Sequence, residues 1–291
     1  MLAKGNPTSI KEARTATFPC ALTIAGSDSG GNAGIQADLR AFHAYGLHGC
    51  TAITALTAQN PRGVRAVHVA PPAFVADQLD AIFEMYGVRA LKTGMLATAD
   101  VIEVVAEKLA ARPRVKKVID PVMVATSGAK LLADDAEAAL AERLLPLATL
   151  ITPNLPEAEV LLGDEIGTAA DVRLAAKTLA RKFRCAVLVK GGHAAGGAAE
   201  DVLYDGRRFK TFSRPRIARP VSTHGTGCTL AAAIAAGLAL GRPLAAAVED
   251  AKIYVYEAIK LSYHIGQNCG VLGMPKKRSK KYGQGTAARH G

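Results

Sequence analysis

Short apolar runs alternate with helical patterns along this chain from Phe18 onward, and this rhythm restricts the possible folds more than any other feature. The apolar runs are too short to be helices, and the stretches between them carry apolar residues at helical spacing, as Val75, Leu79 and Ile82 do. Strand and helix repeated many times predict an α/β fold, a mostly parallel sheet with helices on both faces. The predicted strands are Cys20–Ala25, Gly49–Leu56, Val64–Val69, Val88–Thr93, Lys117–Asp120, Leu150–Thr152 and Ala186–Lys190, and one predicted helix is Pro72–Tyr86.

One segment departs from this rhythm. Residues 201–213, DVLYDGRRFKTFS, place an Asp-Gly turn between two extended pieces and predict an antiparallel hairpin at a sheet edge. In open α/β sheets ligands bind outside the carboxyl ends of the strands. We therefore look for chemistry in the residues that directly follow each strand.

The length and composition fit one soluble domain. The chain has 291 residues, and we expect one domain at 18–274, a flexible extension at 1–17 and a disordered tail at 275–291. No apolar run reaches the ~18 residues that cross a bilayer, so we expect no membrane partner. The five cysteines are scattered without C-x-x-C spacing, which indicates a reducing, cytoplasmic compartment.

The positive charge is concentrated at one end. The tail 275–291 holds six Lys or Arg and no acid, and removing these from the net charge of +11 leaves +5. A basic tail can contact nucleic acid, but a solvated end explains it more simply. We expect no specific nucleic-acid partner.

Two early segments carry candidate binding residues. The glycines of GSDSGGNAGIQADLRAF, beginning at Gly26, let a ligand approach the backbone, although the loop fits neither the dinucleotide nor the P-loop pattern. Asp38 lies on the following helix, where it can also be an ordinary solvated residue. Gln59 ends the second strand, and its amide matches the donor and acceptor edge of an aminopyrimidine, or simply caps a loop.

Polar residues also follow the later strands. Asp120 is either a turn-forming residue or a ligand for a hard cation. Glu157, with Asn154 at the start of a helix, can hold hydrated Mg²⁺ or favour the helix dipole. Lys190 is either a point charge for phosphates or a surface lysine.

The segment STHGTGCTLAAAIAAGLAL joins a glycine-rich turn to an alanine-rich helix that we expect to begin at Cys228. Gly225, Thr226 and Gly227 allow successive N–H groups to point at one spot, where an anion is stabilised. The same field is expected to lower the pKa of Cys228, making it a candidate base or nucleophile. A small buried cysteine without a role is the alternative.

Seven motifs in order then resemble the hydroxymethylpyrimidine and phosphomethylpyrimidine kinases of thiamine biosynthesis, in the ribokinase-like superfamily. They are ALTIAGSDSGGNAGIQADLRAF, GCTAITALTAQN, KTGML, DPVM, LITPNLPEAEVLL, VLVKGGH and THGTGCTLAAAIAAGLALG. The resemblance implies a three-layer α/β/α sandwich with a mostly parallel central sheet. The sequence departs from the family pattern at Asn32, at Thr93, after about Tyr263 and in the basic tail.

The resemblance also implies the activity and its residues. The family transfers the γ-phosphoryl group of ATP, with Mg²⁺, to the hydroxymethyl group of the pyrimidine and then to the monophosphate, and its members are commonly homodimers. Cys228 stands where most ribokinase-like enzymes have an aspartate base. The implied roles are the pyrimidine site for Gly26, Asp38, Gln59, Met95 and Val122, the anion hole for Gly225, Thr226, Gly227 and Cys228, the ATP phosphates for Lys190 and Asn154, and Mg²⁺ for Asp120 and Glu157.

Two other enzymes remain open. Some pyridoxal kinases of the same superfamily carry the cysteine form of the anion hole, although Gln59 favours the pyrimidine. A cysteine-dependent acyl or thiol enzyme would use Cys228 as a nucleophile with His224 as its partner.

Overall fold

The computed structural model describes residues 18–60, 62–124, 131–133, 135–191 and 198–275. The predicted extension 1–17 and the predicted tail, apart from its first residue, lie outside the described residues. In chain order the elements are β1 Cys20–Asp28, α2 Gly34–Ala44, β2 His48–Asn60, β3 Gly63–Val69, α3 Pro72–Met85, β4 Val88–Thr93, α4 Ala99–Ala110, β5 Lys116–Ile119, α5 Ala136–Ala139, η1 Leu140–Leu144, η2 Leu145–Leu147, β6 Leu150–Ile151, α6 Leu155–Leu162, α7 Ala169–Phe183, β7 Ala186–Lys190, β8 Ala198–Tyr204, β9 Phe209–Pro215, α8 Thr226–Ala239, α9 Leu244–Lys260, β10 Tyr263–Ile265 and β11 Cys269–Val271.

The central sheet is mostly parallel, as predicted. Among the described residues it has nine strands in the order β3-β2-β1-β4-β5-β6-β7-β8-β9. The predicted hairpin is confirmed as β8 and β9, antiparallel at one edge. The other edge differs from the prediction, because β3 pairs antiparallel with β2. Only residues 61–62 separate these two strands, and a parallel crossover needs a dozen residues or more.

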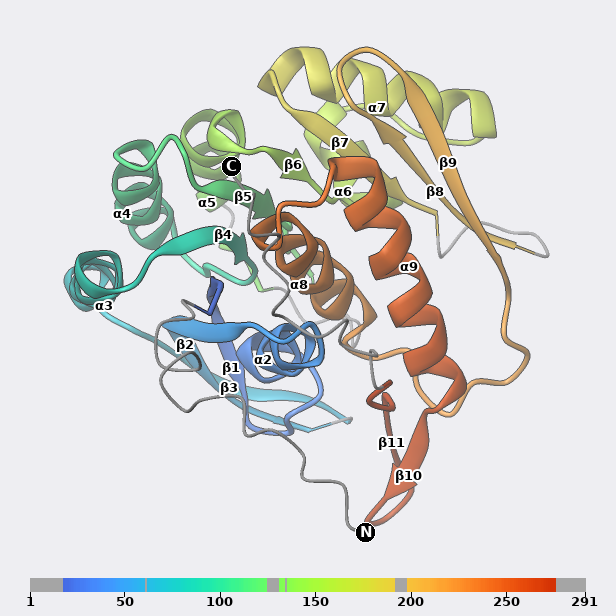
Figure 1. The fold of residues 1–291 in the computed structure, drawn as a ribbon, viewed down its shortest axis with the longest axis horizontal. Coiled ribbons are helices and arrows are strands. Elements are labelled where there is room, and N and C mark those ends of the chain that lie inside the picture. The colour runs from blue at the N-terminus through green and yellow to red at the C-terminus, as the bar shows by residue number, and fades with distance from the viewer. Residues whose placement is uncertain (1–17, 61, 125–130, 134, 192–197, 276–291) are drawn as a thin grey trace, which may run out of the picture.

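Helices cover both faces of the sheet, so the predicted three-layer arrangement is confirmed (Figure 1). Adjacent residues of each strand point to opposite faces. In β5, Val118 faces the core under α2, α8 and α9, whereas Ile119 faces the core under α3, α4 and α7. No helix among the described residues has the length and apolar character that a membrane span requires.

Helix α8 is buried along almost its whole length, which fixes the loop before it. Every residue from Thr229 to Ala239 is buried between the sheet and helices α2 and α9. Gly237 allows close contact with α9, since a Cβ there would lie 2.9 Å from the Cβ of Ala247. The start of α8 is therefore held firmly against the carboxyl ends of β1, β4 and β5.

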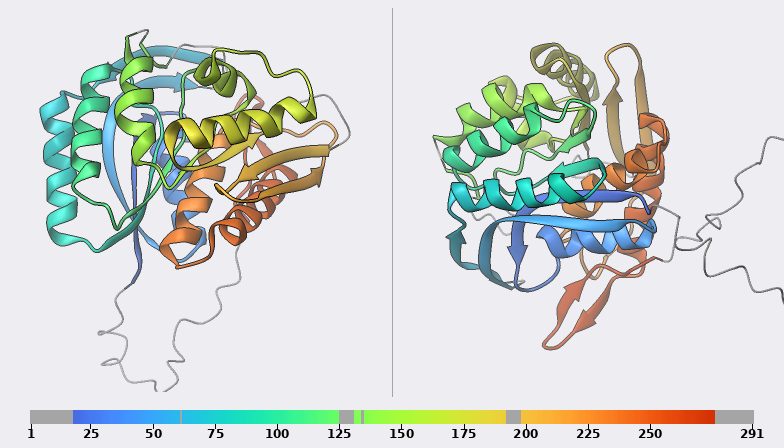
Figure 2. Two further views of the ribbon diagram at one scale, coloured as in Figure 1. Left: turned by 90° about the horizontal axis from the view of Figure 1, so that it is seen from above. Right: turned by 60° about the vertical axis from the view of Figure 1, so that its left-hand side comes forward.

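A small hairpin of β10 and β11 follows α9 and projects from the body of the molecule (Figure 2). It begins at Tyr263, where the sequence departs from the family pattern. Its second strand returns to the domain at Gly270, where an added Cβ would overlap the carbonyl of Val221. The hairpin thus packs against the segment that leads into α8.

Candidate active site

A cavity of about 560 Å³ lies at the carboxyl ends of the parallel strands. It is the place where an open α/β sheet binds its ligands. All the predicted site residues except Asp38 line it. These are Gly26, Gln59, Met95, Asp120, Val122, Asn154, Glu157, Lys190, Gly225, Thr226, Gly227 and Cys228.

The glycine-rich turn forms the start of α8 and one wall of the cavity. The helix begins at Thr226, two residues before the predicted start, with Gly225 as its N-cap. Gly225 has a φ of 85°, and an added Cβ would overlap the carbonyl oxygen of Asn32, so the position requires glycine. The hydroxyl of Thr229 donates to the Gly225 carbonyl at 2.8 Å. The Thr226 N–H donates to the Thr223 carbonyl at 3.3 Å, whereas the N–H groups of Gly227 and Cys228, in the first turn of the helix, have no carbonyl of the helix before them to bond.

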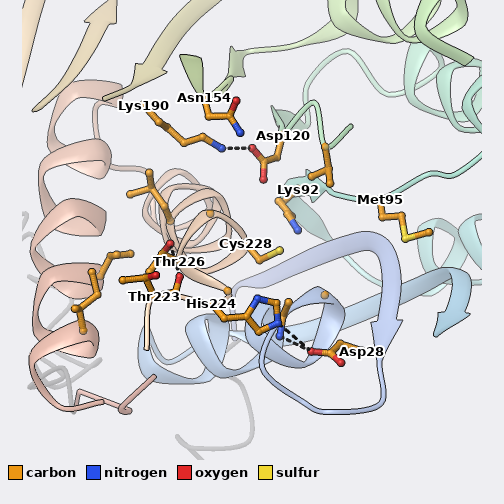
Figure 3. A pocket seen from close by; sticks show the side chains of 18 of the residues that line it. Asp28, Lys92, Met95, Asp120, Asn154, Lys190, Thr223, His224, Thr226 and Cys228 are labelled. Atoms are coloured by element: carbon orange, nitrogen blue, oxygen red, sulfur yellow. Dashed lines mark hydrogen bonds and ion pairs between the residues drawn. The ribbon is translucent and has the colours of Figure 1, made fainter. Parts of the chain in front are cut away.

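An ion pair stands directly over this helix start (Figure 3). The Lys190 ammonium lies 2.8 Å from Asp120 Oδ1, which also accepts the hydroxyl of Thr152 at 2.8 Å. A Cβ on Gly227 would be 3.7 Å from Lys190 Nζ and 3.9 Å from Asp120 Oδ2. Burial alone would raise the pKa of Asp120, but Lys190, Lys92 and the hydrogen bond from Thr152 together outweigh it, and the pKa lies below its ordinary value. The site therefore holds a permanent charge pair beside an anion-binding turn.

Asn154 and Glu157 form a capping box at the start of α6. Asn154 Oδ1 accepts the Glu157 N–H at 2.8 Å, and Glu157 Oε2 accepts the Asn154 N–H at 2.8 Å. Glu157 also lies 3.9 Å from the Lys190 ammonium. Burial raises the pKa of Glu157 to about 7, although Lys190 opposes the shift. Both of the roles considered for Glu157, helix stabilisation and a cavity carboxylate, are thus compatible with its position.

Asp120 and Glu157 fit a hydrated divalent cation. The described residues contain no group of three or more His, Cys, Asp and Glu side chains that could hold a metal alone. Magnesium, however, is commonly held by one or two carboxylates together with water and phosphate oxygens. Both carboxylates face the cavity on the same side as Lys190.

The opposite end of the cavity is suited to a flat ring. Gly26, Met95 and Val122 line a slot at this end. An added Cβ on Gly26 would lie only 3.2 Å from the Met95 sulfur, so the absence of a side chain at Gly26 lets Met95 pack closely against the loop. The Gln59 amide lies at the rim, where its oxygen accepts the Thr57 hydroxyl at 3.3 Å and its nitrogen lies 3.5 Å from His224 Nε2. These two contacts fix the orientation of the Gln59 amide at the rim.

Asp38 is the exception among the predicted residues. It lies beneath the cavity, fully buried, where it accepts the Thr23 hydroxyl at 2.6 Å and the Lys92 ammonium at 2.9 Å. Asp38 does not itself line the cavity, and its part in the pyrimidine site stays a prediction. The alternative of a solvated residue is wrong, because Asp38 is fully buried. Lys92, which the motif analysis passed over, takes the place on the cavity wall. The sequence signal for Lys92 is a lysine that directly follows the apolar pair Ala90 and Leu91 in β4.

Cys228 is half-buried on the cavity wall, close to Lys92 in Figure 3. Burial raises the pKa of its thiol, while Lys92 and the N–H of Gly34 lower it, and burial prevails. The expected lowering of this pKa is thus wrong, because desolvation outweighs the nearby positive charge.

Asp28 is a further residue that the motif analysis missed. Its carboxylate accepts three backbone N–H groups of the first loop, from Gly30 at 2.8 Å and from Asn32 and Ala33 at 2.9 Å. His224 lies 3.9 Å from it across the cavity mouth (Figure 3). Asp28 therefore fixes the loop whose glycines shape the slot. An Asp within a glycine-rich turn is the available sequence signal.

Comparison with known proteins shows the family to which the chain is similar. The phosphomethylpyrimidine kinase family matches residues 28–273. The thiamine biosynthesis bifunctional protein ThiED of Geobacter sulfurreducens is 51% identical over 88% of this chain, which spans only 53% of that longer protein. A hydroxymethylpyrimidine/phosphomethylpyrimidine kinase of Synechococcus elongatus is 50% identical, and the match covers 88% of this chain and 97% of the relative.

A solved structure gives the same fold. The ADP complex of Bacillus subtilis pyridoxal kinase superposes with a TM-score of 0.83 at 40% identity, covering 89% of this chain and 98% of that one. The predicted ribokinase-like architecture is confirmed. With nearly the whole described domain matched and relatives about half identical, the chain belongs to the phosphomethylpyrimidine kinase family.

Proposed function

We propose that this protein uses ATP and Mg²⁺ to phosphorylate hydroxymethylpyrimidine and then to phosphorylate the resulting monophosphate. One observation carries the proposal: the anion-binding turn of Gly225, Thr226 and Gly227 lies against the Lys190–Asp120 ion pair. Phosphoryl transfer depends mainly on positioning and on stabilising charge at the transferring oxygens. The turn and the ion pair together can position a phosphate group and stabilise its charge.

The remaining residues have complementary parts. Lys190, with Asn154 beside it, binds the ATP phosphates, and Asp120 and Glu157 hold Mg²⁺ directly or through water. The cation supplies charge neutralisation to the phosphates when it is bound. The start of α8 stabilises charge on the transferring group, and Cys228 accepts the hydroxyl proton. These roles are supported by the fact that all of the residues line the same cavity.

The end of the cavity that Gly26, Met95 and Val122 line receives the pyrimidine. Gln59 pairs with the amino group and the neighbouring ring nitrogen. Pyridoxal kinase is the second candidate, supported by its structural similarity and by the shared architecture. The relatives at about half identity and the orientation of the Gln59 amide favour the pyrimidine.

A thiol enzyme is a weaker alternative. His224 lies beside Gln59 and Asp28, so its ring is engaged at the cavity mouth. We further propose a cytoplasmic homodimer, on the basis of the scattered free cysteines and the family resemblance. Size-exclusion chromatography with light scattering tests the oligomeric state.

The activity is tested by following ADP release with hydroxymethylpyrimidine, its monophosphate or pyridoxine as the acceptor. We expect release with both pyrimidines, dependent on Mg²⁺. Gly227→Val is the control against contaminating kinases, because its side chain would enter the space beside Lys190 and Asp120. Release with pyridoxine alone, or equal release from the Gly227→Val protein, would contradict the proposal.

A further inference from the structure

The proposed function gives no role to the buried ion pair between Lys92 and Asp38. Both side chains are fully buried, and Lys92 Nζ lies 2.9 Å from Asp38 Oδ2. A buried ion pair is costly to desolvate, and apolar replacements are often at least as stable. Stability alone therefore does not explain why this ion pair lies in the cavity wall.

The local structure makes room for the ammonium. A Cβ on Gly94 would lie 2.7 Å from Lys92 Nζ, so the absent side chain is what admits the charge. An ammonium has three donors, and Asp38 accepts one of them. The end of Lys92 also reaches the cavity and points toward the sulfur of Cys228 (Figure 3).

The charges that face Cys228 come from four elements. They are Lys92 on β4, Asp38 on α2, Asp120 after β5 and Lys190 at the end of β7. Asp120 and Lys190 form their own pair at 2.8 Å. Both lysines act on the sulfur, but Lys92 is the largest influence that lowers the pKa of Cys228, and the N–H of Gly34 at the start of α2 also lowers it.

We propose that Lys92 is a positioning residue for Cys228, with its ammonium, held by Asp38, stabilising the thiolate that acts as base in the first transfer. The inference rests on the proposed function for that step. The acceptor O–H bond breaks and its proton moves to the sulfur. The freed oxygen pair forms the new bond to the γ-phosphorus, and the bond to the bridging oxygen breaks as ADP leaves with its electrons.

The two members of the pair have opposite effects on the thiol. The positive charge of Lys92 lowers the pKa of Cys228, and the negative charge of Asp38 raises it. Lys92→Met should therefore move the pKa upward, and Asp38→Asn should move it downward. A pair that merely stabilised the fold would not give shifts of opposite sign.

The test is the rate at which iodoacetamide alkylates Cys228 as a function of pH, read by peptide mass spectrometry to separate it from the other four cysteines. Lys92→Met should slow alkylation about tenfold at a pH below the midpoint, equivalent to about one pKa unit. Asp38→Asn should speed it. Lys108→Met, which breaks the exposed Lys108–Asp80 pair, is the matched control and should leave the midpoint unchanged.

A double variant, Lys92→Met with Asp38→Leu, covers the case in which the single variants do not fold, since it leaves no unpaired buried charge. Lys92 affects the pKa of the Cys228 thiol more than Asp38 does. The alkylation midpoint of the double variant should therefore lie above that of the unchanged protein. A midpoint at or below that value, or single shifts of the same sign, would overturn the proposal. Alkylation needs neither ATP nor acceptor, so its outcome is independent of whether the proposed substrate is right.

Discussion

Cys228 meets two acceptors that differ in their need for a base. The hydroxymethyl group must lose a proton as it attacks, whereas a phosphate monoester, with a second pKa near ~6, is mostly dianionic at neutral pH. Cys228→Ala should therefore lower kcat for the first transfer by about 10²-fold or more, the usual range for a general base, and change the second transfer much less. Steady-state kinetics with each acceptor measure this, with pyrimidine binding followed by calorimetry.

Cys228→Ser is the matched control, because it keeps a small polar side chain at the start of α8. Equal losses in both transfers would show that Cys228 belongs to the anion hole rather than acting as a base. Near-normal turnover in both would show that the turn alone suffices.

Gln59 is the residue on which the choice of substrate depends. Gln59→Leu should lower kcat/KM for hydroxymethylpyrimidine by about tenfold or more, since a lost hydrogen bond leaves the buried amino edge unpaired. Pyridoxine, which presents a phenolic oxygen instead, should lose less. Parallel assays give kcat/KM for the two acceptors. Equal losses of kcat/KM would show that Gln59 does not distinguish the pyrimidine from pyridoxine.

At the scale of elements, the start of α8 depends on Gly225. In Gly225→Ala, the alanine would have to adopt a left-handed backbone conformation, which costs about 1–3 kcal/mol of folding free energy. Its Cβ would also overlap the Asn32 carbonyl. We expect lower stability in urea unfolding together with loss of activity. Gly241→Ala is the control, because Gly241 has a φ of 76° with no atom near its Cβ position. If the two substitutions lowered stability and activity equally, the contact between Gly225 and Asn32 would have no role.

The capping box of α6 gives a pH-dependent prediction. The pKa of Glu157 rises from 4.5 to about 7 in the folded protein, so its contribution to stability is complete below pH 4.5 and is lost as the pH rises through 7. Glu157→Gln resembles the protonated form and keeps the acceptor for the Asn154 N–H. It should unfold like the unchanged protein at pH 4.5 and be more stable at pH 8 by on the order of 2 kcal/mol.

The control is the exposed capping box of α7, where hydrogen bonds from Thr168 lower the pKa of Asp171. Asp171→Asn should show the opposite sign, losing stability at pH 8. If Glu157 also holds Mg²⁺, Glu157→Gln gains stability while its Mg²⁺-dependent activity falls. Lower stability at pH 8 would contradict the burial argument.

The sequence predicts those elements that local pattern determines. Ala186–Lys190 and the turn between β8 and β9 carry their own signals, strand periodicity and an Asp-Gly pair. The antiparallel pairing of β3 and the β10–β11 hairpin depend on loop length and on contacts with distant segments, so local pattern misses them. Likewise, Asp38 and Lys92 are 54 residues apart, and they come together beneath Cys228 only because α2 packs on β1, the strand that pairs with β4.

The whole molecule separates a compact domain from a basic end. The described residues that line the cavity run from Ala25 to Ile259, whereas six basic residues follow Met274. A chain truncated after Met274 should keep its kcat and KM, because it retains every described residue that lines the cavity. Side-by-side kinetics of the two chains measure this. Loss of activity on truncation would contradict this expectation and show that the enzyme needs the tail.

The central claim is that one cavity carries out two successive transfers to a pyrimidine. The direct measurement is mass spectrometry of the products formed from the purified protein, ATP, Mg²⁺ and the pyrimidine monophosphate. We predict the diphosphate, with one ADP released for each molecule formed. Recovery of unchanged monophosphate, from a protein that phosphorylates pyridoxine under the same conditions, would contradict the account.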